Sequence, residues 1–497
     1  MPITPPFDDF RATYEAGRPQ LVWMTLPADL ETPVSVMLKL ADRRPNSFLL
    51  ESVEGGSVRG RYSFVGLNPD VLWRCRGKAA EINREPRFSP DAFVADDRPP
   101  LDSLRALIAE SLVPIPEGLP PMAAGLVGYM GYDTVRLAEA IPDTKPDLLG
   151  VPDGLFMRPT VMAVFDTIED TLTLVTPVRP APALSAGEAY DRARERLAGV
   201  LDDVGRSLPF PAAAKAEPVP LPVSNMSREA FKKMVAKGKE YILAGDIFQV
   251  VLSQRFSLPF ALPPFALYRA LRRTNPSPFM FFLDFGGFQI AGASPEILVR
   301  LRKGVVTIRP IAGTEPRGAD AAEDARLAAE LRADPKELAE HLMLLDLGRN
   351  DVGRVARVGT VKVTEQMVIE YYSHVMHLVS NVEGELAPGR DAMDVLMAGF
   401  PAGTVSGAPK VRAMEIIDEL EPVRRGVYAG CIGYISGNGD MDTCIALRTA
   451  VIKDGIMHVQ AGGGIVADSD PDKEFRESSN KARALLRSAE IAHRYAR

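Results

Sequence analysis

The strongest constraint on the fold is the way short strand-like runs alternate with amphipathic helices and glycine-rich turns. Strand-like composition recurs in FMFFLDFGGFQIAGAS (279–294), GVVTIRPIAG (304–313) and MHVQAGGGIV (457–466). Turns such as FGGF and SGNGD are short enough to join antiparallel neighbours, whereas parallel strands need long crossover connections. We therefore expect an α+β fold in which mixed, largely antiparallel sheets pack as a sandwich flanked by helices.

One composition break divides the chain. The segment SLPFPAAAKAEPVPLPVS (207–224) is rich in proline and alanine and has no hydrophobic periodicity, which is typical of a semi-rigid linker. Amphipathic helices are predicted on both sides of it, in residues 187–207 and 228–245. We therefore expect an N-terminal domain over residues 1–220 and a C-terminal domain over residues 221–497, closely associated with each other.

Bulk properties exclude several classes of protein. The formal net charge of −7 makes nucleic acid an unfavourable partner, since binding to phosphates relies on excess lysine and arginine. No run approaches the roughly 20 consecutive apolar residues of a membrane helix. The three cysteines are far apart and odd in number, so they predict neither a disulfide framework nor a CxxC metal site. We expect a cytoplasmic protein with no nucleic-acid or membrane partner.

Two segments share an acidic design, ADPKELAEHLMLLDLGRND (333–351) and SDPDKEFRESSNKARALLRSAE (469–490). Each begins with a capping aspartate and a proline suited to the first helical turn. Each then places two glutamates three residues apart, on one helix face: Glu337 with Glu340, and Glu474 with Glu477. Each pair alone is explained by helix capping and dipole effects. If the two helices meet, the four carboxylates suit Mg²⁺, which prefers oxygen ligands.

Four further features are candidates for chemistry, each with a structural alternative. The glycines of QAGGGIV (460–466) could form an anion-binding nest or a tight turn. Arg448, in an apolar segment, needs a carboxylate from the protein or from a ligand. Glu296 could be a general acid if burial raises its pKa, or a residue at the rim of a site. His377 lies in an apolar run, where a hydrogen-bonded core histidine is the common case.

Many segments of the chain, in order, resemble those of the chorismate-utilising enzymes. They include GDIFQVVLSQRF, NPSPFMFF, GASPE, RPIAGTEPRG, KELAEHLMLLDLGRND, VMHLVS, FPAGTVSGAPK, YAGCIGYIS, ALRTA, QAGGGIV and KEFRESSNKA. The resemblance covers nearly all of residues 228–490, and FLLESV and RYSFVG resemble the N-terminal domain of the family.

The resemblance implies chorismate as the substrate, bound together with Mg²⁺. It implies metal ligands at Glu340 and Glu477, supported by Glu337 and Glu474. It assigns catalytic roles to Glu296, as the acid that protonates the departing 4-hydroxyl group, and to His377 and Thr404. The substrate-binding residues that it implies are Gly313, Thr314, Thr404, Tyr428, Arg448, Gly462, Gly463, Gly464 and Lys481.

Two positions favour amination over the other reactions of the family. Relatives that add water to chorismate carry a lysine base where this chain has Gln249, and Ala312 replaces the lysine that aminodeoxychorismate synthases use covalently. The resemblance therefore implies anthranilate and pyruvate as products, the first committed step of tryptophan biosynthesis. The alternatives are an aminodeoxychorismate synthase of folate biosynthesis and a catalytically inactive paralogue that senses tryptophan.

The resemblance also implies partners and control. No cysteine lies in the G-x-C-x-G-x-Q context of a glutaminase, so the resemblance implies a separate glutamine amidotransferase subunit as the source of ammonia, with free ammonia as the alternative donor. It also implies a heterotetramer of two large and two small subunits. L-Tryptophan is expected as a feedback inhibitor at LLES and NPSPFMF, with contacts from Glu51, Ser52, Pro278, Phe279 and Met280. The alternative is that both strings are ordinary core strands and turns.

Overall fold

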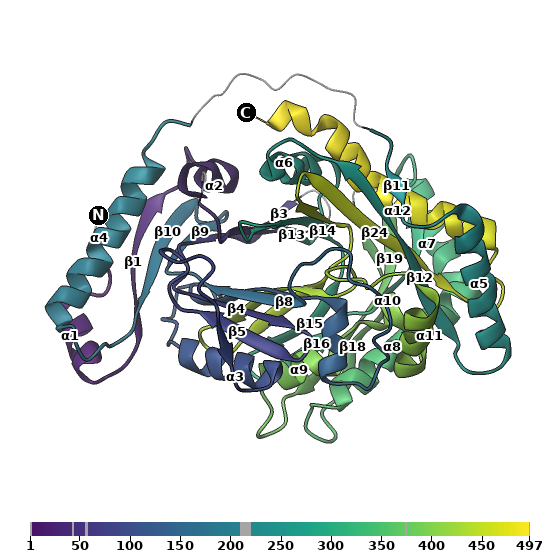
Figure 1. Ribbon diagram of the computed structural model, residues 1–497, viewed down its shortest axis with the longest axis horizontal. Coiled ribbons are helices and arrows are strands. Elements are labelled where there is room, and N and C mark those ends of the chain that lie inside the picture. Colours follow the sequence, from purple (N-terminus) through teal and green to yellow (C-terminus); the bar gives the residue numbers. More distant parts are fainter. Residues whose placement is uncertain (1, 42–43, 55–57, 209–219, 373–374, 497) are drawn as a thin grey trace.

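In the computed structural model, two twelve-stranded sheets form the body of the molecule (Figure 1). The structure describes residues 2–41, 44–54, 58–208, 220–372 and 375–496. Every strand pair among these residues is antiparallel. Together with the flanking helices, this arrangement confirms the predicted α+β class.

The first sheet contains strands from both parts of the chain. Its order is β1 (Gln20–Pro27), β10 (Thr171–Val178), β9 (Val161–Asp166), β3 (Val58–Leu67), β2 (Ser47–Glu54), β13 (Phe279–Asp284), β14 (Gln289–Ser294), β23 (Thr449–Lys453), β24 (Ile456–Ile465), β12 (Gln249–Pro259) and β11 (Val223–Ser224), with β20 (Gly407–Ala408) also paired to β12. The pairing of β2 with β13 joins the two parts by main-chain hydrogen bonds, with Glu51 opposite Met280.

The second sheet is shared in the same way. Its order is β17 (Ile311–Pro316), β19 (Val375–Glu385), β16 (Val305–Ile308), β15 (Ile297–Arg302), β22 (Met441–Ile445), β21 (Cys431–Ser436), β7 (Gly125–Met130), β8 (Gly154–Arg158), β4 (Val71–Arg76), β5 (Ala79–Asn83) and β6 (Val94–Asp96), with β18 (Lys362–Tyr371) also paired to β19. Here β7 and β21 make the junction. Both sheets therefore run across the boundary predicted at residue 220.

The inner faces of the sheets meet in one apolar cluster, and the outer faces are covered by helices. Alternation along the strands separates the two environments: Phe48 and Phe281 lie in the inner cluster, whereas their neighbours Leu49 and Phe282 lie in the outer cluster of the first sheet. Burying side chains of this size contributes roughly 1.5–3 kcal/mol each. Such strict alternation fixes the strand register, since a shift of one residue would exchange the two faces.

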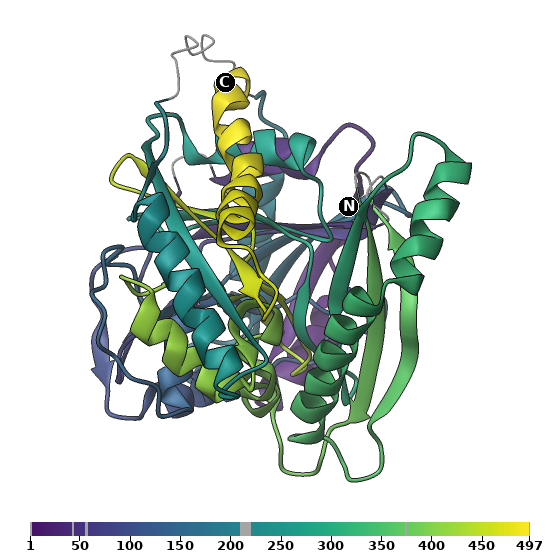
Figure 2. The same ribbon diagram turned by 90° about the vertical axis from the view of Figure 1, so that its right-hand side faces the viewer.

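The helices, in chain order, are α1 (Phe7–Glu15), α2 (Pro33–Ala41), α3 (Pro100–Ser111), α4 (Ala186–Val204), α5 (Arg228–Leu243), α6 (Pro264–Thr274), α7 (Ala321–Ala333), α8 (Pro335–Gly353), α9 (Ala392–Gly399), α10 (Gly403–Ser406), α11 (Lys410–Leu420) and α12 (Pro471–Ile491). Figure 2 shows the C-terminal helix α12, in yellow, beside α5 in teal, with the green helices α7 and α8 on the other side. Among the described residues, no helix combines the length and apolarity needed to cross a membrane.

The predicted linker falls only partly within the described residues. Residues 209–219 lie outside the described part of the chain. Its last residues, Val223 and Ser224, form β11 and pair with Ser257 and Phe256 of β12, so the linker prediction extended too far at this end. Composition alone could not show this, because the hydrogen-bonding partner lies more than thirty residues further along the chain.

Candidate functional site

One cavity of about 600 Å³ brings together the predicted catalytic, substrate-binding and metal-binding residues. It lies where β12 and β24 of the first sheet, β17 and β19 of the second, and helices α8, α10 and α12 approach one another. All fifteen of these predicted residues line it: Glu296, Gly313, Thr314, Glu337, Glu340, His377, Thr404, Tyr428, Arg448, Gly462, Gly463, Gly464, Glu474, Glu477 and Lys481. Residues that are spread over nearly two hundred positions of the sequence therefore line one cavity.

The two acidic helices begin as the sequence predicts. The side chain of Asp334 accepts hydrogen bonds from the backbone N–H groups of Lys336 and Glu337, and Asp470 accepts one from Lys473. These caps leave the glutamates of the following turns free to face the cavity. Glu477 also forms an i,i+4 ion pair with Lys481, at 2.8 Å, but both side chains are about half exposed, so the pair contributes little to stability.

The four glutamates line the cavity from two sides, Glu337 and Glu340 from α8, and Glu474 and Glu477 from α12. Burial, reinforced by the neighbouring carboxylates, raises the pKa of Glu337 and of Glu474. Within the described residues, no three acidic, histidine or cysteine side chains are grouped closely enough to hold a metal by themselves. Mg²⁺ is usually held by one or two carboxylates together with water and substrate oxygens, so this divided donor set fits that ion.

Glu296 has the environment of a general acid. It follows β14, is 8% exposed, and accepts a hydrogen bond of 2.9 Å from the Thr404 hydroxyl group. Burial raises the pKa of Glu296 to about 8, although the hydrogen bond from Thr404 opposes the shift. The carboxyl group is therefore protonated at neutral pH and has a proton to donate.

His377 is a neutral hydrogen-bonding residue in the cavity wall. Its Nδ1 atom lies 2.8 Å from the hydroxyl oxygen of Thr314 and 3.4 Å from the carbonyl oxygen of Gly313. Burial, followed by the charge of Arg448, lowers the pKa of His377. Gly313 has a φ of +83°, and an added Cβ atom would lie 3.3 Å from the carboxylate of Glu337, so a side chain here would be strained.

Arg448 is the strongest candidate for an anion-binding group. Its backbone has a φ of +47°, which is uncommon for a residue other than glycine. Within the part of the chain that the structure describes, no hydrogen bond or ion pair satisfies its guanidinium group, and burial lowers the pKa of Arg448. A partly buried cation without a protein partner is best explained by a carboxylate from a ligand.

The triple glycine forms neither the turn nor the nest that the sequence suggested. Gly462, Gly463 and Gly464 lie inside β24, opposite Ser253, Leu252 and Val251 of β12. Beyond Val459, β24 has no second neighbour among the described strands, so every other main-chain group points away from β12.

The free edge of β24 belongs to Gly462 and Gly464. The N–H group of Gly462 donates to the hydroxyl of Tyr428, and its carbonyl accepts from Lys481 at 3.1 Å. Main-chain groups alternate in direction along a strand, so the N–H of Gly464 also points to the free edge, whereas the N–H of Gly463 points toward β12. The backbone of Gly463 is therefore not a ligand donor; its role is steric, because a Cβ atom there would lie 2.9 Å from the carboxylate of Glu474.

A buried ion pair that sequence reasoning missed supports the cavity wall. Arg425 is 1% exposed and donates two hydrogen bonds to Glu421, at 2.9 and 2.6 Å, and others to the carbonyl oxygens of Val251 and Val405. Its guanidinium carbon lies 5.5 Å from the ring centroid of Tyr428. The i,i+4 spacing of Glu421 and Arg425 was visible in the sequence, but its complete burial was not.

The residues predicted to bind tryptophan lie together at the β2–β13 junction but on different faces. The carboxylate of Glu51 accepts hydrogen bonds from Tyr268 at 2.6 Å and from Arg272 at 2.6 and 2.7 Å, on the face covered by α6. Met280 shares this face, whereas Phe279 packs toward the second sheet. Pro278 is partly buried before β13, and Ser52 lies against Gly60 of β3. The carboxylate of Glu51 is thus already paired.

Comparison with known proteins agrees with this geometry. Residues 48–487 match the family described as chorismate binding enzyme. Since the match spans most of the chain, the protein belongs to this family. Anthranilate synthase component 1 of Cereibacter sphaeroides is 59% identical over 495 residues, covering 99% of this chain and 98% of that protein. The protein of the same name from Pseudomonas aeruginosa is 51% identical, with 94% of each chain covered.

A solved structure supports the fold. The crystal structure of anthranilate synthase component I from Streptococcus pneumoniae superposes with a TM-score of 0.75 at 40% sequence identity, covering 86% of this chain and 92% of that one.

Proposed function

We propose that the chain converts chorismate and ammonia to anthranilate and pyruvate. The observation that carries this proposal is the single cavity in which a protonated acid, an unpaired arginine and two pairs of carboxylates meet. The relatives of the same family, which are named for this activity, support it over nearly the full length of the chain.

The cavity offers a separate partner for each charged group of chorismate. The guanidinium group of Arg448, with the Tyr428 hydroxyl and the N–H of Gly464, holds the enolpyruvyl carboxylate. The ammonium group of Lys481 lies near the ring carboxylate. Gly313, Thr314 and Thr404 line the space for the ring.

Mg²⁺ fits the acidic side of the cavity, with Glu340 and Glu477 as ligands and Glu337 and Glu474 as their support. When bound, it neutralises the ring carboxylate of the substrate. Burial, with the neighbouring carboxylates as a smaller cause, raises the pKa of Glu337 and of Glu474, so a cation in the cavity would favour the charged form of both groups.

Glu296 supplies the proton in the first step. Ammonia forms a bond to C2 of the ring while the 4-hydroxyl group departs, and Glu296 donates a proton to that leaving group. Loss of the C2 proton and of the enolpyruvyl side chain then gives anthranilate and pyruvate. His377, neutral and held by Thr314, lies beside the ring as a hydrogen-bonding group.

Gln249 favours amination over hydration. Its Nε2 atom lies 3.4 Å from Glu340, while its Oε1 atom is buried and has no hydrogen-bond partner in the described structure. An amide cannot act as the base that activates water, but its carbonyl oxygen can accept a hydrogen bond from ammonia. Ala312, in β17, has no nucleophile to offer.

A separate amidotransferase subunit supplies the ammonia from glutamine. Cys75, Cys431 and Cys444 are all buried and free, and burial raises the pKa of each thiol, so none is a thiolate nucleophile at neutral pH. Free thiols also suit the reducing cytoplasm. A heterotetramer of two large and two small subunits rests on the family resemblance alone, as do the roles of residues 1–220 in regulation and 221–497 in catalysis.

Product identification tests the proposal. The purified chain is incubated with chorismate, a magnesium salt and an ammonium salt, and the aromatic product is identified by chromatography and mass spectrometry. Anthranilate with equimolar pyruvate is expected; glutamine should replace ammonia only when the amidotransferase subunit is added. Isochorismate, salicylate or accumulating 4-amino-4-deoxychorismate would contradict the proposal, as would complete inactivity with ammonia.

A further inference from the structure

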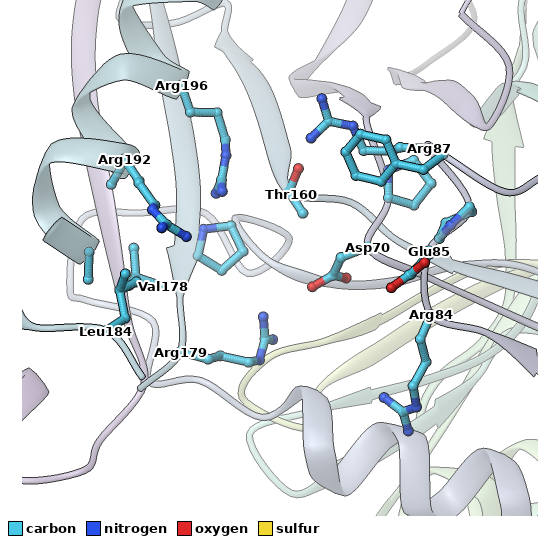
Figure 3. Close-up of a pocket in the computed structure, with 16 residues that line it drawn as sticks. Asp70, Arg84, Glu85, Arg87, Thr160, Val178, Arg179, Leu184, Arg192 and Arg196 are labelled. Carbon is cyan, nitrogen blue, oxygen red and sulfur yellow. The ribbon is translucent and has the colours of Figure 1, made fainter. Parts of the chain in front are cut away.

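A second cavity, of about 370 Å³, lies in the N-terminal part of the chain (Figure 3). It is bounded by α4, the end of β10, the turn between β8 and β9, and the segment that follows β5. Its lining residues all fall between Pro69 and Arg196, whereas those of the catalytic cavity begin at Gln249. The two cavities therefore share no residue.

The second cavity is strongly basic in a chain of net charge −7. Five arginines line it, against two carboxylates, Asp70 and Glu85. The five are Arg84, Arg87, Arg179, Arg192 and Arg196.

Of the charged residues that line the cavity, one arginine and one carboxylate are neutralised by ion pairs with residues outside the lining. Arg84 forms a bidentate pair with Glu110, at 2.8 Å for both contacts, and Asp70 is held by Arg158 at 2.7 and 3.1 Å. Among the described residues, the other four lining arginines form no ion pair with a carboxylate, although the charge of Asp70 acts to raise the pKa of Arg179 and of Arg196. The cavity thus has an excess of positive charge that the protein itself does not neutralise.

The four unpaired guanidinium groups are directed into the same space. Figure 3 shows Arg179, Arg192 and Arg196 reaching into it from one side and Arg87 from another, while Arg84 turns away. Two of them are anchored: Arg196 donates to the Thr176 hydroxyl group, and Arg179 donates to the carbonyl oxygen of Ser111 at 3.0 Å.

The positive charges of Arg179 and Arg196 are destabilised where they lie, by burial and by neighbouring arginines. The Nε atom of Arg179 is buried without a hydrogen-bond partner in the described structure. Burial, followed by the charge of Arg158, lowers the pKa of Arg179 to about 10. Burial and the charge of Arg87 lower the pKa of Arg196. Both remain protonated at neutral pH, so an anion in the cavity would relieve this repulsion.

We propose that this cavity binds a small phosphorylated molecule, whose phosphate group is held by Arg87, Arg179, Arg192 and Arg196. A phosphate monoester carries nearly two negative charges and three acceptor oxygens, and guanidinium groups match such oxygens in a bidentate manner. A single carboxylate would satisfy only one of the four. The cavity is larger than a phosphate group needs, and Phe88, which is 82% exposed, offers an apolar surface to the rest of the molecule.

Ligand titration of the full-length chain tests this proposal. Ribose 5-phosphate is the probe, and ribose and inorganic phosphate are the comparisons, all at constant ionic strength set with sodium chloride. We expect ribose 5-phosphate to bind saturably by calorimetry and to raise the thermal unfolding midpoint of the protein. Ribose should have neither effect. Inorganic phosphate should bind more weakly, because it leaves the remainder of the cavity empty.

Matched variants locate the site. Arg192→Gln and Arg196→Gln should each weaken ribose 5-phosphate binding about tenfold, the usual effect of one lost charge-assisted contact. Arg194→Gln is the control, since Arg194 lies on the same helix, pairs with Asp191 and does not line the cavity. The proposal is wrong if neither phosphate probe binds saturably, if Arg194→Gln weakens binding as much as Arg192→Gln, or if an aspartate-rich peptide binds in preference to both probes.

Discussion

The hydroxyl group of Thr404 donates a hydrogen bond of 2.9 Å to the carboxyl group of Glu296, from a position 108 residues further along the chain. This contact joins the short helix α10 to the end of β14. It also sets the acidity of the site, because the hydrogen bond from Thr404 lowers the pKa of Glu296 while burial raises it, and burial prevails.

The first prediction concerns the pH dependence of turnover. With the pKa of Glu296 at about 8, the proton donor is present below that pH and is lost above it, so kcat/KM should fall as pH rises through about 8. Glu296→Gln should lower kcat by about 10²- to 10⁴-fold. Thr404→Val removes a contact that lowers the pKa, so the alkaline limb should move to higher pH. A limb that stays in place or moves to lower pH in this variant would show that another group is the acid.

The same group should leave a signature in stability. The pKa of Glu296 is higher in the folded protein, at about 8, than its ordinary value of 4.5. Its contribution to the unfolding free energy is therefore fully present below pH 4.5 and is lost as pH rises toward 8. The thermal midpoint of Glu296→Gln, compared with that of the wild type from pH 5 to pH 9, should lack this component. Parallel profiles of the two proteins would contradict the assignment.

The second prediction concerns Arg448. Arg448→Gln should lower kcat/KM for chorismate by at least about a hundredfold, because a buried charge-assisted contact of two or more hydrogen bonds is lost. Its thermal stability should be unchanged or higher, since the arginine has no partner in the described structure and its charge is costly to bury. Steady-state kinetics and a thermal melt check both parts. A destabilised variant with normal kinetics would show a structural residue instead.

Sequence reasoning succeeded where the signal is local. The caps at Asp334 and Asp470 and the glutamate pairs depend on neighbours within a few residues, and the structure confirms these local features. The meeting of α8 and α12 across one cavity depends on long-range packing, which no local pattern specifies. The prediction that Glu340 and Glu477 share one metal site rested on the family resemblance, not on periodicity.

The failures have the same physical origin. Gly462 to Gly464 suggested a turn because glycine is common there, but their pairing with β12 makes them a strand. Composition predicted a linker up to residue 224, but Val223 and Ser224 form strand β11 and pair with β12. Phe279 and Met280 were both predicted to contact tryptophan, but they lie on opposite faces of the first sheet. The sequence did not show which face of the sheet each side chain would occupy.

The third prediction concerns the metal. Glu340→Gln and Glu477→Gln should each abolish Mg²⁺-dependent turnover, or raise the Mg²⁺ concentration needed by more than about tenfold, because each removes a charged oxygen ligand. Their thermal midpoints should change little, since the Glu477–Lys481 pair is half exposed. Glu490→Gln is the control, an exposed residue of α12 outside the cavity. Mg²⁺ titration of activity gives the result, and near-normal titrations of both cavity variants would refute the metal assignment.

The last prediction concerns feedback inhibition by tryptophan. The predicted site at the β2–β13 junction joins the two parts of the chain, so a ligand there could bias how they sit. Because Glu51 is engaged by Arg272 and Tyr268, its carboxylate must leave these partners to meet the ligand's ammonium group, which makes Ser52 the clearer probe.

Two variants alter Ser52 in different ways. Ser52→Phe should fill the indole site and relieve inhibition while uninhibited turnover stays near the wild-type rate. Gly60→Ala should have the same effect, because an added Cβ atom would lie 1.6 Å from the present position of the Ser52 hydroxyl oxygen and must displace it. Gly287→Ala is the matched control, since nothing lies within 4 Å of its added Cβ atom. In the wild type, tryptophan should weaken chorismate binding by the same factor as chorismate weakens tryptophan binding. Full sensitivity to millimolar tryptophan in both Ser52→Phe and Gly60→Ala, or an insensitive wild type, would place the control of this enzyme elsewhere.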